Sequence, residues 1–354
     1  MKICKLEIKN IRNFKDLKLD LNYPLVIING ENAAGKTNLL ESIYFLALTK
    51  SFKKGKEIDV ILKGEELGII KGFFETEDKE NLEIEFVINT KKISKLNGAV
   101  RPMKDIIGNA EIVIFTVDDL DIINEPSKKR RFLNILISLL DKKYFFDLSE
   151  YEKVIKRRNK TLILLRLGRS KIQELDFWNE RIANLGESII RKRKSIIDKI
   201  NEILKSSAFF DKLLFLQYEP QCFSAEKIMR QLKERIERDV AMGQTTVGPH
   251  RDIIKFNLGG IDLESYGSRG EKRSAIIDLK RAEIELIKTE KNILPIFLLD
   301  DVFSELDSNN TNNVLKLIGN QQTIITTIHL DNVKDFFKKA KIYKIENGEI
   351  KNDQ

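Results

Sequence analysis

Cysteine and histidine are scarce in this chain, which has only two of each among its 354 residues. Cys4 and Cys222 lie far apart in the sequence, and neither belongs to a spacing typical of metal ligands. Two histidines are too few to complete a zinc site. We therefore expect no zinc centre, and we expect both thiols to be buried or inert.

Long hydrophobic runs are also missing. The longer apolar stretches, such as residues 25–29 and 296–299, are strand-sized and far shorter than the ~20 residues that a membrane-spanning helix needs. Residues 1–7 alternate polar and apolar side chains as a strand does, and they lack the charged start and apolar core of a signal peptide. We expect a cytoplasmic protein without a membrane partner.

Positive charge is concentrated in one segment. The net charge is +8, but residues 127–205 alone carry 21 Lys and Arg against 10 Asp and Glu, a surplus of 11 that leaves the rest of the chain at −3. A localised basic surface attracts a polyanion such as DNA, because each neutralised phosphate releases counterions. The alternative is a helical face that is merely solvated.

Strand and helix patterns alternate in the N-terminal part. Short strands are expected within residues 3–28, where the run 25–28 predicts a buried central strand, and helical spacing follows from Leu39 to Leu48. Further strands are expected at 82–88 and 112–115. The pair Asn97-Gly98 predicts a hairpin turn because both residues tolerate positive φ.

The middle of the chain is different. From Pro126 to about Ser206 the strand patterns vanish, and apolar residues recur three and four apart as in amphipathic helices. Beyond this segment the alternation of strands and helices resumes. The pattern predicts an α/β fold with a mixed sheet: one discontinuous domain from residues 1–125 and 207–354, into which a basic helical arm, residues 126–206, is inserted.

The clearest motif fits the pattern G-x-x-x-x-G-K-[ST] and lies between the predicted buried strand and the following helix. Backbone N–H groups of such a loop surround a β-phosphate, Lys36 can reach the β- and γ-oxygens, and the Thr37 hydroxyl can ligate Mg²⁺. The motif therefore predicts a P-loop that binds ATP with Mg²⁺. Its residues are Gly30, Glu31, Asn32, Ala33, Ala34, Gly35, Lys36 and Thr37.

A P-loop needs a carboxylate at the end of a neighbouring strand, and the apolar run 296–299 ends in Asp300 and Asp301. We expect Asp300 to hold the metal together with Thr37. Asp301 would face the γ-phosphate and orient or deprotonate the attacking water. The alternative for the acidic pair is a strand end or a helix cap.

Two further segments suggest a site shared between two copies. Ser268, Arg269, Gly270 and Glu271 precede a long helix, and Ser304 and Asp307 follow the acidic pair. The arrangement resembles ATPases of the ABC class, in which the serine-glycine signature of one subunit caps the γ-phosphate bound by the other, and nucleotide holds the dimer together. Taken alone, the first segment would be an ordinary helix cap.

Several independent strings together resemble the RecF family of DNA replication and repair proteins, over most of the chain. Asn134 stands where that family usually has Asp. The strings are Ile11-Arg12-Asn13-Phe14, Gly35-Lys36-Thr37-Asn38-Leu39-Leu40-Glu41-Ser42-Ile43, Pro126-Ser127-Lys128-Lys129-Arg130-Arg131-Phe132-Leu133, Arg158-Asn159, Trp178-Asn179, Leu185-Gly186 and Gly248-Pro249-His250-Arg251-Asp252.

The resemblance implies an ABC/SMC-type ATPase head with Arg12, Asn13 and Asn38 at the nucleotide. It implies a protein of recombinational repair and replication restart that dimerises on ATP, binds single-stranded or duplex DNA at junctions or gaps, and hydrolyses ATP slowly, stimulated by DNA, to release it. RecR and RecO are the implied partners. The alternatives are an SMC-like structural head, for which an arm reaching about 60 Å is too short, and an ABC-type nucleotide-binding subunit.

Some positions depart from the family pattern or allow two interpretations. Ala33 replaces a loop glycine, which we expect to be tolerated only with negative φ. Trp178 is expected to pack in the core. The 248–252 string is either a rigid turn in which Arg251 pairs with Asp252 or another carboxylate, or a sensor of nucleotide, partner or DNA. His329 is displaced from the position of a switch histidine, and we expect no catalytic role for it.

Overall fold

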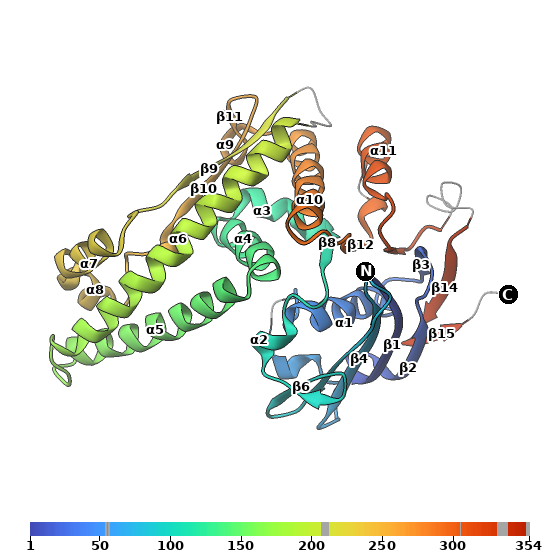
Figure 1. Ribbon diagram of the computed structural model, residues 1–354, viewed down its shortest axis with the longest axis horizontal. Helices are drawn as coiled ribbons and strands as arrows, with labels where there is room; N and C mark the ends of the chain where they lie inside the picture. The colour runs from blue at the N-terminus through green and yellow to red at the C-terminus, as the bar shows by residue number, and fades with distance from the viewer. Residues whose placement is uncertain (54, 56, 207–211, 305, 331–338, 352–354) are drawn as a thin grey trace. The chain divides into compact units, whose positions relative to one another are not determined.

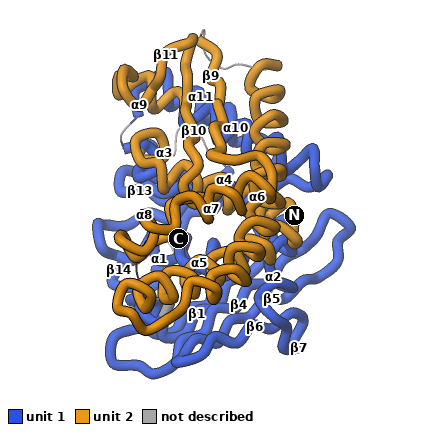
Figure 2. Tube along the Cα trace, turned by 90° about the vertical axis from the view of Figure 1, so that its left-hand side faces the viewer, with its two compact units in different colours: residues 1–120, 276–354 blue, residues 121–275 orange. Residues whose placement is uncertain are grey.

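The computed structural model describes residues 1–53, 55, 57–206, 212–304, 306–330 and 339–351. The chain divides into two compact units (Figure 2). Unit 1 contains residues 1–120 and 276–354, and unit 2 contains residues 121–275. A long helix, α10 (Arg269–Lys291), includes the second boundary between them.

A six-stranded sheet in unit 1 carries the P-loop. Its order is β15-β14-β3-β13-β12-β8, and all pairs are parallel except β14 with β15. Val26, Ile27 and Ile28 of β3 are fully buried, which confirms the predicted central strand. The strands are β3 (Leu25–Asn29), β8 (Ile112–Thr116), β12 (Ile296–Asp300), β13 (Thr323–Thr327), β14 (Lys341–Glu346) and β15 (Glu349–Lys351).

A second six-stranded sheet in unit 1 is antiparallel, in the order β2-β1-β4-β5-β6-β7 (Figure 1). Asn97 and Gly98 join β6 to β7 with φ of 48° and 77°, which confirms the predicted turn. The strands are β1 (Lys2–Ile11), β2 (Phe14–Asp20), β4 (Gly68–Glu75), β5 (Asn81–Ile88), β6 (Lys92–Leu96) and β7 (Ala99–Val100).

Helix α1 (Lys36–Leu48) lies between the two sheets. It contacts β4 and β5 of the antiparallel sheet and β8, β12 and β13 of the parallel sheet, and every residue from Leu39 to Leu48 is buried. Apolar side chains are therefore needed on every side of this helix, which explains why its sequence shows little amphipathicity. The other helical elements of unit 1 are η1 (Glu57–Val60), α2 (Met103–Ile106), η2 (Val117–Leu120), η4 (Val302–Ser304) and α11 (Ser308–Leu317).

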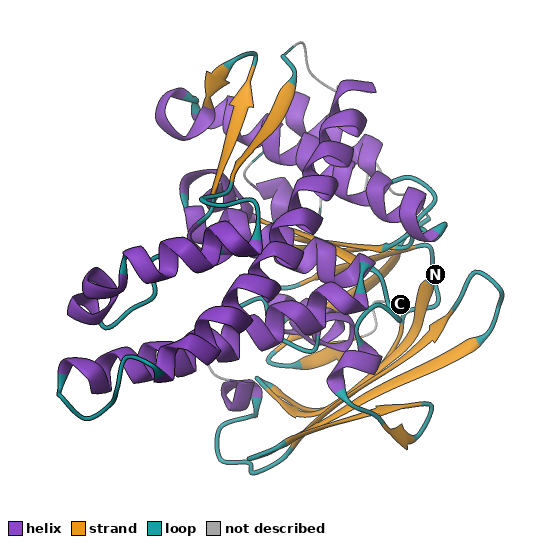
Figure 3. Cartoon of the chain, turned by 60° about the vertical axis from the view of Figure 1, so that its left-hand side comes forward, coloured by secondary structure: helices purple, strands orange, loops and turns teal. Residues whose placement is uncertain are grey.

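Unit 2 is mainly helical, as predicted for residues 126–206 (Figure 3). Its long helices α5 (Lys142–Arg166) and α6 (Glu174–Ser206) pack against each other. No described helix of the chain is both long enough and apolar enough to cross a membrane. The remaining elements are α3 (Asp121–Asn124), α4 (Pro126–Leu140), α7 (Ala225–Glu234), α8 (Ile236–Met242), η3 (Pro249–Arg251), α9 (Leu263–Tyr266) and the antiparallel sheet β9 (Leu214–Glu219), β10 (Ile253–Leu258) and β11 (Ile261–Asp262).

The compact unit that contains the predicted arm extends beyond Ser206 to Ala275. The reason is that β9 and α7 both pack on α6, so the polypeptide after the arm shares its core. The division of the chain into a head of 1–125 and 207–354 and an arm of 126–206 remains a prediction about domains.

Two buried arginines organise the core of unit 2. Arg158 of α5, which is fully buried, donates hydrogen bonds to Asn179 (2.8 Å), Asp239 (2.7 Å) and Thr245 (2.9 Å). Each buried cation requires such partners, because an unpaired charge in the interior costs several kcal/mol, on the order of 3–5. Arg193 of α6 is the second, and it bonds the carbonyl of Pro249, Asn134 and Asp252.

Candidate functional site

The P-loop connects the end of β3 to the start of α1, the strand-loop-helix order that the motif predicts. The Lys36 ammonium donates to the carbonyl oxygens of Gly30 (2.7 Å) and Glu31 (2.9 Å), so the side chain folds back over the loop. Burial lowers the pKa of Lys36, and the carboxylates of Asp301 and Asp300 act in the opposite direction. The charged amine is therefore held beside the loop by both its carbonyls and the acidic pair.

Ala33 adopts a left-handed conformation with φ of 64°, so the expectation of negative φ was wrong. The loop must turn sharply so that its next N–H groups converge, and it imposes this conformation on whichever residue stands there. Alanine tolerates it at a cost of about 1 kcal/mol because its side chain is the smallest that carries a Cβ. Gly35, with φ of 118°, completes the turn.

The Thr37 hydroxyl donates to Oδ1 of Asp300 at 3.0 Å. The same carboxylate oxygen accepts from the hydroxyl of Thr326 at 2.7 Å, on the strand between β3 and β12. The predicted metal residues are thus brought together at the carboxyl ends of parallel strands. Among the residues that the structure describes, no group of three or more His, Cys, Asp and Glu could hold a metal. A hydroxyl and one carboxylate fit Mg²⁺, which is usually bound by one or two carboxylates plus substrate phosphates.

Asp301 follows Asp300 in a left-handed conformation, with φ of 52°. Its backbone N–H donates to the carbonyl (3.2 Å) and hydroxyl (3.1 Å) of Thr326, which fixes the turn. The side-chain oxygen Oδ1 is buried and, within the described chain, accepts no hydrogen bond. Burial raises the pKa of Asp301, against the opposing charge of Lys36. A desolvated carboxylate with a free oxygen is suited to accept a proton from water.

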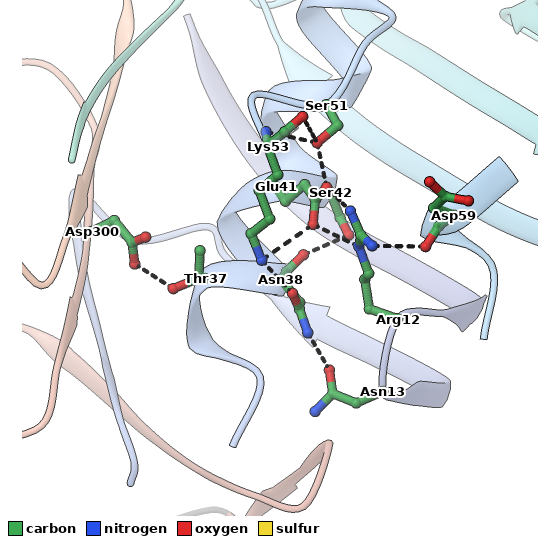
Figure 4. Close-up of polar contacts among 10 residues, drawn as sticks. All are labelled: Arg12, Asn13, Thr37, Asn38, Glu41, Ser42, Ser51, Lys53, Asp59 and Asp300. Atoms are coloured by element: carbon green, nitrogen blue, oxygen red, sulfur yellow. Dashed lines mark hydrogen bonds and ion pairs between the residues drawn. The ribbon is translucent and has the colours of Figure 1, made fainter. Parts of the chain in front are cut away.

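A series of hydrogen bonds beside α1 supports the backbone of the P-loop (Figure 4). Lys53 donates to Asn38 (2.6 Å), Asn38 to Asn13 (2.8 Å), and Asn13 to the carbonyl of Ala34 (2.8 Å). Asn13 also lies so close to Gly35 that a Cβ there would come within 2.5 Å of its amide nitrogen. Asn13 and Asn38 therefore position the loop backbone.

Arg12 and Glu41 form an ion pair beside these polar contacts. The guanidinium donates two hydrogen bonds to the Glu41 carboxylate, at 3.0 and 2.6 Å, and a third at 2.7 Å to the carbonyl of Asp59. Burial alone would raise the pKa of Glu41, but hydrogen bonds from Arg12 and Ser51 hold it below the usual value. The sequence patterns gave no reason to expect roles for Ser51 and Lys53, whereas Glu41 lies inside the family string that begins at Gly35.

Ser268 caps helix α10 through a reciprocal capping box, the ordinary alternative that its sequence allowed. Its hydroxyl accepts from the Glu271 N–H at 3.2 Å, and its own N–H donates to the Glu271 carboxylate at 3.0 Å. A hydrogen bond from Lys212 lowers the pKa of Glu271 to about 2. Ser268, Arg269 and Gly270 remain exposed. That these residues contact the nucleotide bound by a second copy remains a prediction.

The other predicted contact loop is ordered by local hydrogen bonds. The Ser304 hydroxyl donates to the carbonyl of Asp301 at 2.6 Å, which ties the loop to the acidic pair. Asp307 is the N-cap of α11 and accepts from the N–H of Asn310 at 2.8 Å. Glu305, between them, lies outside the described residues.

The 248–252 string forms a rigid turn, but its pairing differs from the expectation. Asp252 is fully buried and accepts from Tyr218 (2.5 Å) and from Arg193 (3.5 Å) rather than from Arg251. Arg251 is exposed and donates to the amide oxygen of Gln244 at 3.3 Å. Arg193 of α6 is therefore the ion-pair partner of Asp252, although proximity in sequence had suggested Arg251.

Trp178 does not lie in the core, contrary to expectation. It is half-buried on α6 and forms an edge-to-face pair with Phe177, with ring centroids 4.9 Å apart. Its neighbour Asn179 points inward instead and accepts from Arg158. The helical period explains the correction, because consecutive residues on a helix face different directions and Asn179 occupies the buried position.

Comparisons with known proteins place the whole chain in one family. Residues 2–351 match the family model of the RecF/RecN/SMC N terminal domain. The DNA replication and repair protein RecF of Agathobacter rectalis is 36% identical over 359 residues, which cover 99% of both chains, and that of Clostridium tetani is 34% identical over 99% of both chains.

Solved structures agree with these relatives. A structure described as the recombination mediator protein RecF with ATP in the RecFOR pathway is 30% identical, with a TM-score of 0.90 over 99% of this chain and 97% of that one. An SMC head bound to a winged-helix domain of ScpA, 17% identical with a TM-score of 0.55, shares the fold. The chain belongs to the RecF family of DNA replication and repair proteins, ATPases of the ABC/SMC type.

Proposed function

We propose that this chain binds ATP with Mg²⁺ and hydrolyses it slowly, and that ATP brings two copies together on DNA during recombinational repair. The observation that carries the proposal is the meeting of Lys36, Thr37 and Asp300 at one edge of the parallel sheet. This constellation supplies a cation for the phosphates and two hard oxygen ligands for the metal. The relative whose structure is described as RecF with ATP supports it.

Hydrolysis is assigned to the acidic pair and the P-loop. Lys36 binds the β- and γ-phosphate oxygens, and the loop N–H groups hold the β-phosphate. When bound, Mg²⁺ would neutralise negative charge on the phosphates, and Thr37 and Asp300 would be its protein ligands. Asp301 orients the attacking water and takes its proton through Oδ1, which accepts no hydrogen bond from the described residues. Its side chain is short, which fits slow turnover.

A second copy completes each site in this proposal. Ser268 and the first N–H groups of α10 would cap the γ-phosphate bound by the other subunit, and Ser304 and Asp307 would contact the partner near that site. The exposure of Ser268, Arg269 and Gly270 supports this, since no Cβ at Gly270 would meet another atom within 4 Å. The dimer therefore forms only with the triphosphate.

DNA, RecR and RecO are the proposed macromolecular partners, and a cytoplasmic location is proposed with them. DNA as a partner is supported by relatives named as DNA replication and repair proteins. RecR and RecO as partners are supported by the solved relative, whose description names the RecFOR pathway. DNA is expected to stimulate hydrolysis, and hydrolysis to release it. The segment 127–205 contributes the positive charge that phosphates require.

The test combines DNA binding with phosphate release. Fluorescence anisotropy of a labelled gapped duplex should rise with the wild-type protein in ATP and much less in ADP, and the DNA should increase the rate of phosphate release. Lys36→Met should abolish both responses while retaining the circular dichroism spectrum. Equal binding with ATP, with ADP and by the variant would contradict the proposal.

A further inference from the structure

Helix α5 carries a stripe of exposed positive charge. Lys153, Lys156, Arg157 and Lys160 lie at positions i, i+3, i+4 and i+7, so they share one face of the helix over about 10 Å. Lys153 is paired with Glu150 at 2.6 Å. Lys156 and Lys160 have no acidic partner within ion-pair distance among the described residues. These two side chains are therefore available to an external anion.

An aromatic pair borders the stripe on the neighbouring helix α6. Phe177 is 56% exposed, and Trp178 is half-buried beside it. The guanidinium of Arg157 lies 5.6 Å from the centre of the Trp178 ring, and that of Arg181 lies 5.8 Å from the Phe177 ring. Arg157 thus belongs to both groups. Cations and aromatic faces form one continuous surface of unit 2, the α5–α6 surface.

We propose that the α5–α6 surface binds single-stranded DNA, an inference that rests on the proposed function and names the part of the chain that touches the strand. Lys156 and Lys160 would neutralise phosphates, while an unpaired base stacks on Trp178 and contacts the edge of the Phe177 ring, which stands at 74° to the indole. Every base offers a π-face, so the surface reads no sequence. Duplex DNA would gain only the phosphate contacts, because its base faces are already stacked on one another.

Trp178 is the only tryptophan in the chain and therefore reports on its own contact. Titration of the full-length protein with a dT oligonucleotide in the presence of ATP should quench its fluorescence in a saturable way. An equal concentration of blunt duplex should bind without comparable quenching. Binding is followed in parallel by anisotropy of the labelled oligonucleotide, which does not depend on Trp178.

Two sets of variants separate charge from stacking. Lys156→Glu with Lys160→Glu should weaken single-strand binding more than tenfold and reduce the slope of log K against log salt by roughly 1.4, at ~0.7 for each phosphate contact. The milder pair Lys156→Gln with Lys160→Gln covers the case in which reversal disturbs folding. Trp178→Ala should weaken binding roughly tenfold, and Trp178→Phe should restore most of it.

Lys227→Glu with Lys233→Glu, on α7 of the same unit, is the matched control of equal charge change and should bind nearly as the wild type does. Wild-type DNA binding without quenching, or binding that survives the α5 substitutions, would overturn the surface and leave the proposed function intact. Equal quenching by duplex or by poly-glutamate would also overturn it. Absence of DNA binding with any nucleotide would instead contradict the proposed function.

Discussion

The Thr37 hydroxyl and the Asp300 carboxylate, 263 positions apart in sequence, are joined by a hydrogen bond of 3.0 Å. Thr37 lies at the start of α1, after the loop that follows β3, and Asp300 ends β12. Strand β13 lies between β3 and β12, and its Thr326 bonds the same carboxylate oxygen. Because all three strands are parallel, their carboxyl ends meet at one edge of the sheet. The register of the sheet therefore sets the geometry of the proposed metal ligands.

Thr37→Ala should lower the rate of ATP hydrolysis at least 100-fold and weaken Mg²⁺-dependent binding of ATP, because one of two protein ligands is lost. Thr37→Ser keeps a hydroxyl at the same place and should retain most activity. Phosphate release and isothermal titration across a Mg²⁺ series measure both effects. Full activity of Thr37→Ala would rule out the metal role of this pair.

Asp301→Asn should reduce hydrolysis by about 100- to 10,000-fold while ATP binding persists. The fold should be no less stable, because the substitution removes a carboxylate that burial disfavours in its charged form. In the wild type, activity should fall as the pH decreases through the pKa of Asp301, because protonated Asp301 cannot accept a proton from water. Since this pKa is raised, the fall should begin at a higher pH than for an ordinary aspartate. Rates measured from pH 4 to 8 check this, and an unchanged rate in the variant would contradict the assignment.

Ala33→Gly should change the free energy of unfolding by less than about 1 kcal/mol. Glycine relieves the left-handed strain, but it also loses more conformational entropy on folding, and the two effects oppose each other. Gly35→Ala should be clearly destabilising and should weaken ATP binding, because its φ is 118° and a Cβ would collide with Asn13. Urea unfolding compares the two, and a larger loss for Ala33→Gly would argue against the left-handed turn.

The buried pair Arg158–Asp239 should matter far more than an exposed pair. Asp239→Ala leaves a fully buried guanidinium uncompensated and should cost roughly 3–5 kcal/mol of stability. Glu187→Ala, which breaks an exposed pair with Arg191, should cost less than about 0.5 kcal/mol. Urea denaturation of the full chain measures both, and similar losses would show that Asp239 does not neutralise Arg158.

His250 should make the protein less stable in mild acid. Its Nε2 donates to the carbonyl of Thr245 at 3.0 Å, so its Nδ1 must accept from the Tyr151 hydroxyl at 2.7 Å, and burial lowers the pKa of His250 from 6.5 to about 4. Between these values the unfolded chain binds a proton that the folded chain does not, so stability falls by about 2 kcal/mol from pH 7.5 to 5. His250→Gln should flatten this part of the curve, and an equally steep curve would assign the loss to other groups.

The elements around the site follow from the sequence because their signals are local. The apolar run before Gly30, the helical spacing after Lys36 and the acidic end of β12 each lie within one element, and the structure places all of them as predicted. The turn at Asn97-Gly98 is equally local. Such signals predict which residues reach the edge of the sheet.

Features that depend on distant contacts were not predictable in the same way. Asp252 pairs with Arg193 of another helix rather than with its sequence neighbour, because burial favours the partner that the packing of α6 supplies. Trp178 is partly exposed because of how α6 is rotated about its own axis. No single apolar residue in the sequence determines that rotation. The φ of Ala33 follows from the whole loop rather than from the residue.

Sedimentation velocity of the full-length protein with ATP, ADP or no nucleotide is the most direct test of a shared active site. Wild type should sediment as a dimer only with ATP and Mg²⁺, and Ser268→Arg should remain monomeric while still binding ATP. Ser206→Arg, an equal substitution at the exposed end of α6, should dimerise as wild type does. A wild-type monomer at saturating ATP, or a Ser268→Arg dimer of wild-type stability, would contradict the proposal that each nucleotide is enclosed by two copies.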